Sequence, residues 1–591
     1  MSPDIDPQLS WTEDDAPRSG RFGDVYFSTE DGLAESRAVF LAGCGLPDVW
    51  SGRSRFTVAE LGFGTGLNIA ALLDLWRLSR PAGGRLHVFS VEAFPMSARE
   101  AARALARWPE LAEVAQPLLA RWPAPAPGFH RIELPGLHAI IDLAIMDAPD
   151  ALAQWEGRAD AWFLDGFAPA ANPAMWSDEV LALVGARSAP GARIGTFTVA
   201  GAVRRGLQTA GFTVDKRPGF GRKRERLEAT LPGPSPQPVA PRVAVIGSGI
   251  AGASLARALR AGGATVRIIE AEAAGAGASG NPAALVTPRF DAGGGPVAAL
   301  FAQAFGHAVR LYDGVPDAVI ATGALQLEAG ERDPARFERI AAQPVWPPDA
   351  LQRVGAAEAS SRLGEPTDRG GLFIRDARVI EPTTVLANWF DGVEVTRARV
   401  ARVEPEGDCW SLIAADGALI AEAEHVVIAA GWGLAALAPD RRLTPARGQV
   451  SIAQGVQGAP AAWGGYIVPT RQGILFGATF DRGETDCDDR PEDDLRNLAT
   501  LAQVRPALAG ELAGAALGHR ARVRATTADH LPVCGELQPG LWVLGGLGSR
   551  GFTTAPLLAE HLAARLLGAP SPLPANLAAL VNPTRASATI A

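Results

Sequence analysis

The sequence predicts an α/β protein in which two Rossmann-like folds are fused. Two glycine-rich turns each follow a short apolar strand, one within Glu60 to Asn68 and the other within Val243 to Gly252. A proline-rich stretch separates them, and the length of 591 residues exceeds what one hydrophobic core supports. We therefore expect two nucleotide cofactors and two reactions in one chain.

The domain boundary is predicted at the proline-rich stretch. Residues 232–241 suit a semi-rigid linker because their prolines exclude a helix or a central strand. The first domain is then 1–231 and the second 242–591. Within the second domain, we expect nucleotide-binding parts at about 242–300, 372–445 and 520–570, and an inserted α+β substrate subdomain in the remainder.

Composition narrows the classes of protein. Hydrophobic residues make up 47% and charged residues 20%, which is typical of globular domains. The acidic N-terminus resembles no signal peptide, and no apolar run reaches the ~20 residues of a membrane span. We expect a cytoplasmic protein without a membrane or an obligate protein partner. The four scattered cysteines predict neither a disulfide framework nor a metal site.

The first glycine-rich turn is the predicted start of a cofactor site. Its glycines let the backbone approach a ligand before a helix begins near Leu67. Acidic residues follow the next two strands, and a carboxylate there can accept hydrogen bonds from ribose hydroxyls. The candidate cofactor-binding residues are Glu60, Gly62, Phe63, Gly64, Thr65, Gly66, Asn68, Glu92 and Asp147.

This order resembles the class I S-adenosylmethionine methyltransferases, in which such positions hold methionine, ribose and adenine in turn. A dinucleotide-binding Rossmann unit is the alternative. Asp165 follows the fourth strand in a segment similar to the Asp/Asn-Pro-Pro-aromatic motif of the members that modify amines. A carboxylate there can orient an amine and accept its proton. The alternative role for Asp165 is a helix N-cap.

A basic segment closes the first domain. Its basic residues surround Phe220, a pattern that favours phosphate binding and stacking on a base. A solvated basic turn is the alternative. The candidate nucleic-acid contacts are Lys216, Arg217, Phe220, Arg222, Lys223 and Arg224. The formal net charge of −9 argues against a surface coated for nonspecific polyanion binding.

The second glycine-rich turn predicts a dinucleotide site. Gly247, Ser248, Gly249 and Gly252 lie between a strand and a helix, and Glu270 follows about twenty residues later at the next strand end. Three further segments suited to close backbone approach favour FAD over a nicotinamide. Their candidate residues are Ala278, Ser279, Gly280, Asn281, Gly431, Gly546, Gly548, Gly551 and Phe552.

These segments resemble the D-amino-acid oxidase and glycine oxidase superfamily. Tyr466, Arg524 and Arg550 match substrate contacts of that superfamily, and either arginine can grip a carboxylate bidentately. The alternatives are a core tyrosine and a surface arginine on a strand. Several arginines could supply a second basic patch beside this site, namely Arg441, Arg442, Arg447, Arg520, Arg522 and Arg524.

Together these motifs, with Phe22 to Ser28 and Gly219 to Glu225, resemble the MnmC family of bifunctional tRNA 5-methylaminomethyl-2-thiouridine biosynthesis proteins over nearly the whole chain. The resemblance implies a tRNA substrate modified at wobble uridine 34. An FAD-dependent step converts 5-carboxymethylaminomethyl-(2-thio)uridine to the 5-aminomethyl form, and S-adenosylmethionine-dependent N-methylation follows. The tRNA is expected to leave one site and rebind at the other.

Two other functions are compatible with the motifs. One is a fused amino-acid oxidase and amine methyltransferase that acts on small molecules, which would not need the basic segment around Phe220. The other is a scaffold with one degenerate domain, against which the intact glycines, Glu92, Asp165 and Glu270 argue.

Overall fold

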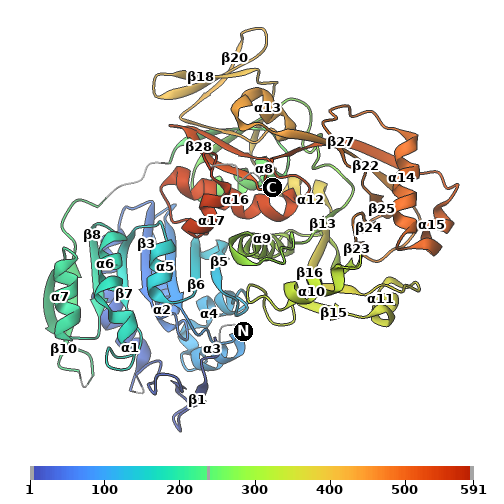
Figure 1. Ribbon diagram of the computed structural model, residues 1–591. Coiled ribbons are helices and arrows are strands. Elements are labelled where there is room, and N and C mark those ends of the chain that lie inside the picture. The colour runs from blue at the N-terminus through green and yellow to red at the C-terminus, as the bar shows by residue number, and fades with distance from the viewer. Residues whose placement is uncertain (1–4, 29, 222, 236–239, 586–591) are drawn as a thin grey trace. The chain divides into compact units, whose positions relative to one another are not determined.

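The computed structural model describes residues 5–28, 30–221, 223–235 and 240–585 and divides into two compact units (Figure 1). The N-terminal unit contains Met1–Val239 and Gly568–Ala575, and the C-terminal unit contains Ala240–Leu567 and Asn576–Ala591. The segment 568–575 contacts the rest of the N-terminal unit through Arg131, whose Nη2 donates to the carbonyl oxygen of Pro570 at 3.2 Å. Within the described ranges, no helix combines the length and apolarity needed to cross a membrane.

An eight-stranded sheet forms the centre of the N-terminal unit. Its strand order is β5-β6-β4-β3-β7-β8-β10-β9. Neighbours from β6 to β8 are parallel, whereas β5, β10 and β9 pair antiparallel. The strands are β3 (Arg55–Leu61), β4 (Arg85–Glu92), β5 (Gly128–Leu134), β6 (Ala139–Ile145), β7 (Ala159–Leu164), β8 (Ser188–Thr196), β9 (Thr213–Pro218) and β10 (Glu225–Thr230).

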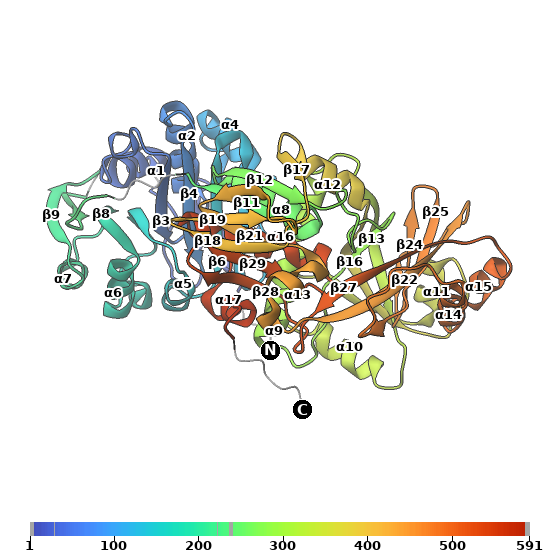
Figure 2. The same ribbon diagram turned by 90° about the horizontal axis from the view of Figure 1, so that it is seen from above.

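Helices cover both faces of this sheet, which explains why its central strands are buried almost throughout. Figure 2 shows α2 and α4 on one face and α5, α6 and α7 on the other. The helices are α1 (Gly32–Ser36), α2 (Leu67–Ser79), α3 (Ala98–Leu105), α4 (Ala112–Leu119), α5 (Ala148–Gln154), α6 (Asp178–Ala186) and α7 (Gly201–Thr209). A small hairpin, β1 (Leu9–Trp11) and β2 (Pro17–Ser19), precedes them.

A six-stranded sheet carries the second glycine-rich turn. Its order is β17-β12-β11-β21-β29-β28, and only the β28–β29 pair is antiparallel. Helices α8 (Ile250–Ala261) and α16 (Gly551–Leu567) pack against each other beside it. The strands are β11 (Arg242–Ile246), β12 (Thr265–Glu270), β17 (Glu394–Arg397), β21 (His425–Ile428), β28 (Val533–Gln538) and β29 (Leu541–Gly545).

A ten-stranded mixed sheet forms the rest of the C-terminal unit, with a separate three-stranded sheet of β18 (Arg402–Glu406), β19 (Cys409–Ile413) and β20 (Leu419–Ala423). The larger sheet contains β13 (Ala284–Val286), β14 (Val319–Leu327), β15 (Leu351–Val354), β16 (Gly371–Ile380), β22 (Thr444–Gln454), β23 (Ala461–Ala462), β24 (Tyr466–Thr470), β25 (Gly473–Gly477), β26 (Asp481–Arg482) and β27 (Gly518–Thr526). Its helices include α9 (Gly295–Asp313), α10 (Asp333–Ala341), α11 (Ala356–Leu363), α12 (Pro382–Phe390), α14 (Pro491–Ala502) and α15 (Pro506–Leu512).

Candidate active sites

The first cavity opens at the carboxyl ends of four neighbouring parallel strands, β6, β4, β3 and β7. It has a volume of about 680 Å³. Gly62, Gly64 and Gly66 have φ values of +89°, +52° and +75°, which side-chain-bearing residues rarely adopt. A Cβ on Gly62 would lie 3.1 Å from the Cα of Gly166. The glycines thus allow two strand-end turns to pack closely.

The acidic residues of the first motif occupy different positions around this cavity. Glu92 is on the wall, and its two oxygens accept the backbone N–H groups of Gly64 and Phe94, each at 2.9 Å. Asp147, exposed, also lines the cavity. Glu60 is fully buried behind the turn, where it accepts from the Ser90 hydroxyl at 2.6 Å, and burial raises its pKa to about 8.

The remaining predicted cofactor residues divide in the same way. Phe63, Thr65 and Asn68 line the cavity together with Gly62 and Gly64, whereas Gly66 lies behind the wall. A Cβ on Gly66 would lie 3.2 Å from the Trp122 ring. Gly66 therefore has a packing role at the start of α2. Glu60, like Gly66, lies behind the cavity wall.

Asp165 lines the cavity and is partly buried. The Asn68 amide donates to its Oδ2 at 2.7 Å. Burial raises the pKa of Asp165 to about 6, although the Asn68 hydrogen bond opposes this shift. Asp165 caps no helix, because the next helical turn begins at Pro173 with Asn172 as its N-cap. The arrangement suits a proton acceptor near neutral pH.

The basic segment forms the hairpin of β9 and β10, and its tip reaches the same cavity. Phe220 and Lys223 line the cavity wall. The stem cations are paired with acids instead: Lys216 lies 2.7 Å from Glu225, and Arg217 lies 3.3 Å from Asp215. Arg224 is exposed and away from the wall, and Arg222 lies outside the described residues.

The cavity lining suits a cationic ligand. Among the described residues, the ionisable side chains on the wall other than Tyr26 are those of Asp24, Glu30, Glu35, Glu92, Asp147, Asp165 and Lys223. Aromatic rings line the same cavity: Phe22 stacks on Phe167 with ring centroids 4.7 Å apart, and Tyr26 meets Phe167 edge-on at 5.1 Å. S-adenosylmethionine carries a sulfonium and an adenine, so an acidic and aromatic cavity fits it.

The second cavity lies at the carboxyl ends of β11, β12, β21 and β29 and has a volume of about 1520 Å³. Gly247, Ser248, Gly249, Glu270, Gly431, Gly546, Gly548, Gly551 and Phe552 all line it. Gly252 does not, but a Cβ there would lie 2.0 Å from the carbonyl oxygen of Gly247, so glycine is needed for α8 to start at the turn.

Glu270 fixes the geometry of this turn. Its Oε2 accepts the backbone N–H of Ser248 at 2.8 Å and the Ser248 hydroxyl at 2.5 Å. A Cβ on Gly247 would lie 2.6 Å from the carbonyl oxygen of Ala429, whereas a Cβ on Gly277 or Gly431 would meet nothing within 4 Å. Close-packed strand ends thus bound one part of the cavity, and glycine backbone with free space beside it bounds another. This combination suits a large dinucleotide such as FAD.

The 275–281 segment is held against this site by side chains from two directions. Ser279 Oγ accepts the backbone N–H of Ile250 at 3.0 Å. Arg520 Nη1 donates to Asn281 Oδ1 at 3.0 Å, and its Nη2 donates to the Gly277 carbonyl oxygen at 2.7 Å. Ala278, Ser279 and Asn281 line the cavity, and Gly280 lies behind them.

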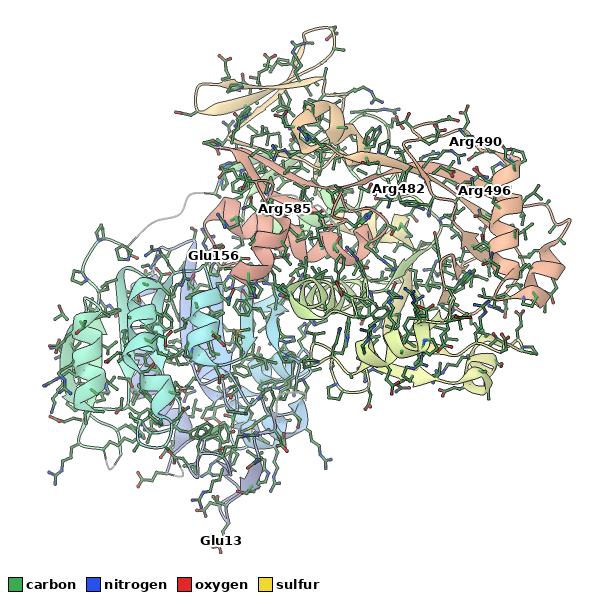
Figure 3. All side chains as sticks on the ribbon, in the orientation of Figure 1. Glu13, Glu156, Arg482, Arg490, Arg496 and Arg585 are labelled. Atoms are coloured by element: carbon green, nitrogen blue, oxygen red, sulfur yellow. The ribbon has the colours of Figure 1, made fainter. Side chains whose placement is uncertain are left out.

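The second basic patch predicted from the sequence is wrong for Arg447. Arg447 is fully buried and contacts Asp493 at 2.5 Å. Arg520 and Arg522 donate to backbone carbonyls of the 275–277 segment. These hydrogen bonds hold both arginines against that segment. Two arginines near α14, Arg490 and Arg496, are themselves paired with aspartates (Figure 3).

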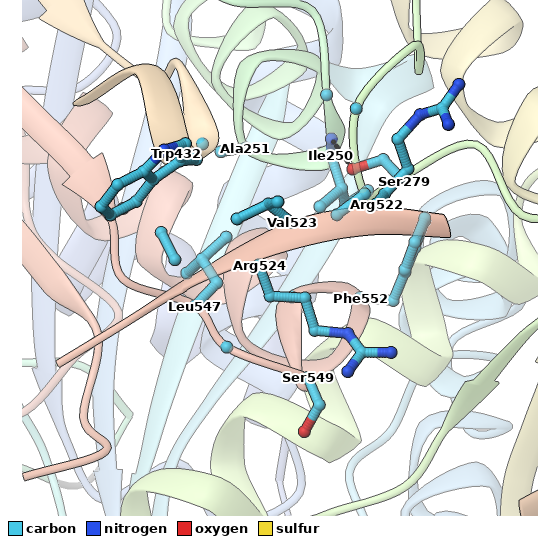
Figure 4. A pocket seen from close by; sticks show the side chains of 18 of the residues that line it. Ile250, Ala251, Ser279, Trp432, Arg522, Val523, Arg524, Leu547, Ser549 and Phe552 are labelled. Atoms are coloured by element: carbon cyan, nitrogen blue, oxygen red, sulfur yellow. Dashed lines mark hydrogen bonds between the residues drawn. The ribbon is translucent and has the colours of Figure 1, made fainter. Parts of the chain in front are cut away.

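Arg524, Tyr466 and Arg550 converge on the second cavity, all partly buried. Arg524 and Arg522 leave β27, and Figure 4 shows the Arg524 guanidinium extending toward Ser549. A Cβ on Gly448 would lie 2.7 and 2.8 Å from Arg524 Nη1 and Nη2, so the guanidinium rests on a glycine. Burial lowers the Arg524 pKa, and burial raises that of Tyr466.

The two candidate arginines differ in their hydrogen bonds. Arg550 Nη1 donates to Thr287 Oγ1 at 2.5 Å. Within the part of the chain that the structure describes, Arg524 makes neither a hydrogen bond nor an ion pair. Its guanidinium lies 6.0 Å from the centroid of the Phe480 ring. A partly buried guanidinium with free donors favours an anionic ligand.

Sequence reasoning missed several wall residues. Glu35 and Phe197 line the first cavity, and Trp463 and Phe480 line the second. Phe480 is an exposed aromatic side chain, 44% accessible, at a cavity wall. None of these residues belongs to a glycine motif, so their position depends on long-range packing. An aromatic beside a strand end was the one local signal available for Phe197.

Comparison with known proteins agrees with the two cavities. Residues 109–232 match the S-adenosyl-L-methionine-dependent methyltransferase family model, and residues 242–565 match the FAD dependent oxidoreductase model. The two predicted cofactors and the predicted fold class are thereby confirmed. An iminodiacetate oxidase from Chelativorans sp. BNC1 shares the fold of the second part, with a TM-score of 0.50, 22% identity, and coverage of 58% of this chain and 100% of its own.

Full-length relatives carry both parts in the same order. The chain is 58% identical to a tRNA 5-methylaminomethyl-2-thiouridine biosynthesis bifunctional protein MnmC from Caulobacter vibrioides, over 99% of this chain and 98% of the relative. It is 45% identical to the protein of the same name from Maricaulis maris, over 96% of this chain and 94% of the relative. The chain therefore belongs to the MnmC family of bifunctional proteins, with a methyltransferase part followed by an FAD-dependent oxidoreductase part.

Proposed function

We propose that this protein carries out two consecutive reactions on the wobble uridine of tRNA. The C-terminal unit removes the carboxymethyl group from 5-carboxymethylaminomethyl-(2-thio)uridine, and the N-terminal unit methylates the resulting 5-aminomethyl group. The observation that carries the proposal is the pairing of two sites in one MnmC-family chain: an unpaired guanidinium, Arg524, in the oxidoreductase cavity and a carboxylate, Asp165, in the methyltransferase cavity.

In the first reaction, the substrate is an N-substituted glycine. Arg524 binds its carboxylate through two parallel N–H donors, which fixes the Cα position in the cavity. Arg550, already bonded to Thr287, supports this charge from a second direction. Tyr466, on β24, lines the same cavity, and because burial raises its pKa it stays a neutral hydroxyl that can donate. These assignments favour Arg524 as the carboxylate anchor.

Bound FAD supplies the two-electron acceptor for the carbon–hydrogen bond next to the amine. Gly247, Ser248, Glu270 and the 278–281 segment are the residues that would hold it. The substrate carbon–nitrogen bond becomes an imine, and addition of water then releases glyoxylate and the primary amine. The second reaction requires this amine, which orders the two steps.

In the methyltransferase cavity, bound S-adenosylmethionine supplies an electrophilic methyl group. Glu92, Asp147 and the Gly62–Gly64 turn would hold it. An amine attacks only through a free lone pair, and aminomethyl groups are largely protonated at neutral pH. Asp165 therefore accepts a proton from the bound amine and orients the nitrogen, and Asn68 fixes the position of its carboxylate.

The tRNA reaches this cavity past the hairpin tip. Phe220 is partly buried on the wall, where it can stack on a base, and Arg224 is exposed beside it. The paired stem residues Lys216 and Arg217 contribute less, because each already neutralises an acid. The predicted phosphate contacts are thus concentrated at the tip of the hairpin.

The test uses tRNA from cells that lack this activity. Purified flavin-loaded protein is incubated with it, with and without S-adenosylmethionine, and the digested nucleosides are analysed by mass spectrometry. The aminomethyl nucleoside should accumulate without the methyl donor and convert to the methylaminomethyl nucleoside when the donor is added. Unchanged tRNA, together with turnover of free N-substituted glycines, would instead favour the small-molecule function.

A further inference from the structure

The ammonium of Lys223 is already bound inside the methyltransferase cavity. Its Nζ donates to Glu35 Oε1 at 2.8 Å and lies 4.2 Å from the centroid of the Phe197 ring. All three side chains line the cavity. A carboxylate and an aromatic face are two groups that bind ammonium ions in proteins. The cavity therefore contains a formed binding site for a primary alkylammonium.

A lysine side chain ends in a methylene group that carries an ammonium. The aminomethyl substituent of the substrate has the same terminal group. We propose that Glu35 and Phe197 form the binding site for the aminomethyl group, and that Lys223 occupies this site in the free enzyme until the substrate displaces it. This inference rests on the proposed function and identifies where its second substrate group binds.

The two partners of the ion pair differ in their exposure. The Lys223 side chain is 48% exposed at the hairpin tip, whereas the Glu35 side chain is 15% exposed on α1. Lysine can therefore turn into solvent and keep its hydration, and ion pairs with such exposed partners are weak. Glu35 stays in the cavity and requires another cation. A substrate ammonium meets that requirement.

Asp165 and Glu35 then have separate tasks. Asp165 already accepts the Asn68 amide, which fixes its carboxylate at the end of β7. Glu35 binds the Lys223 ammonium through Oε1. When the substrate ammonium replaces that of Lys223, the negative charge of Glu35 is still compensated. Glu35 holds the protonated substrate, and Asp165 accepts the proton whose departure frees the nitrogen lone pair. Glu35 is thus a substrate-binding residue and Asp165 the proton acceptor.

The binding site can be tested without tRNA. Lys223→Ala removes the resident ammonium, and saturation-transfer NMR then measures binding of ethylammonium chloride, with S-adenosylhomocysteine present to fill the methyl-donor site. Lys216→Ala is the matched control, because it also removes a lysine paired with a glutamate, at 2.7 Å, but outside the cavity. Thermal melting identifies folded variants, and Lys223→Ser replaces Lys223→Ala if the latter does not fold.

We expect ethylammonium to bind Lys223→Ala in the millimolar range. Wild type and Lys216→Ala should bind it more weakly, because Lys223 competes for Glu35, and Glu35→Gln added to Lys223→Ala should abolish the binding. No binding to folded Lys223→Ala, or equal binding to the Lys223→Ala/Glu35→Gln double variant, would overturn the proposed site.

The reaction supplies a second readout. With tRNA that carries the aminomethyl nucleoside, Glu35→Gln should raise KM for methylation about tenfold, the loss of one charge-assisted hydrogen bond. Glu358→Gln, which removes the acid of an exposed ion pair with Arg362 away from both cavities, should leave KM unchanged. An unchanged KM in Glu35→Gln, or a loss in kcat alone, would overturn the proposal. If wild type itself does not methylate this tRNA, the proposed function fails, and the ethylammonium measurement still decides whether the site exists.

Discussion

Replacement of Arg524 is the sharpest single perturbation of the oxidation step. The guanidinium is partly buried on the cavity wall, it makes no hydrogen bond to the described residues, and it rests on Gly448. Its donors are thus available for a substrate carboxylate. Arg524→Ala removes both parallel hydrogen bonds and leaves the carboxylate with Arg550, whose Nη1 is already bonded to Thr287. The oxidation should be impaired, and the methylation should not.

The expected fall in kcat/KM for oxidation follows from the loss of one member of a desolvated charge pair. Such a truncation costs about 2–5 kcal/mol, and each 1.36 kcal/mol is tenfold in rate, so kcat/KM should fall about 30-fold to a few thousand-fold. The partial exposure of Arg524 places the expected loss near the lower end, about 100-fold. Arg524→Lys keeps the charge without the planar fork and should lose about tenfold.

The assay follows the carboxymethylaminomethyl nucleoside in digested tRNA at several tRNA concentrations, with flavin content checked by absorbance. Methylation of tRNA that already carries the aminomethyl nucleoside is the internal control and should stay at the wild-type rate. If Arg524→Ala retained kcat/KM within threefold of wild type, Arg524 would not be the carboxylate anchor, and Arg550 would be the next candidate.

Three further predictions concern other parts of the molecule. The methylation rate should rise with pH through about 6, because Asp165 accepts a proton only when ionised, and Asp165→Asn should lose about 100-fold or more together with that dependence. Gly448→Ala should impair oxidation alone, because its Cβ would lie 2.7 Å from Arg524 Nη1, whereas Gly330→Ala, with nothing within 4 Å of its Cβ, should not change the rate. Arg505→Met should lower the free energy of unfolding in urea by about 3 kcal/mol, because Glu365, 2.6 Å from Arg505 Nε, stays buried without its cation. Arg505→Met/Glu365→Leu should recover most of this loss, and equal stability of the single variant and wild type would contradict the argument.

Local sequence signals were sufficient for the cofactor turns. Gly62, Gly247 and Glu270 were predictable because a glycine with positive φ, or an acid at a strand end, acts on its immediate neighbours. The helix N-cap alternative for Asp165 required a helix directly after it, but the chain there continues to Pro173 before a helical turn begins. The motif identified the position, but only the structure excludes the capping role.

Charge patterns were less informative than glycine patterns. The sequence shows clustered cations at 216–226, but Lys216 and Arg217 are paired with acids of the same hairpin, and Lys223 is paired with Glu35 from a distant helix. Arg447 is buried beside Asp493, 46 residues away in the chain. Pairing across the fold determines which charges remain available, and no single-sequence window contains both partners.

Mixing two inactive variants tests the central claim most directly. Asp165→Asn should stop at the aminomethyl nucleoside, and Arg524→Ala should leave the carboxymethylaminomethyl nucleoside largely unchanged. If the two sites act in sequence on a tRNA that is released between steps, a mixture of the two variants with S-adenosylmethionine should produce the methylaminomethyl nucleoside at a rate near that of wild type. Persistence of the aminomethyl nucleoside in the mixture, with both variants folded and flavin-loaded, would contradict this account.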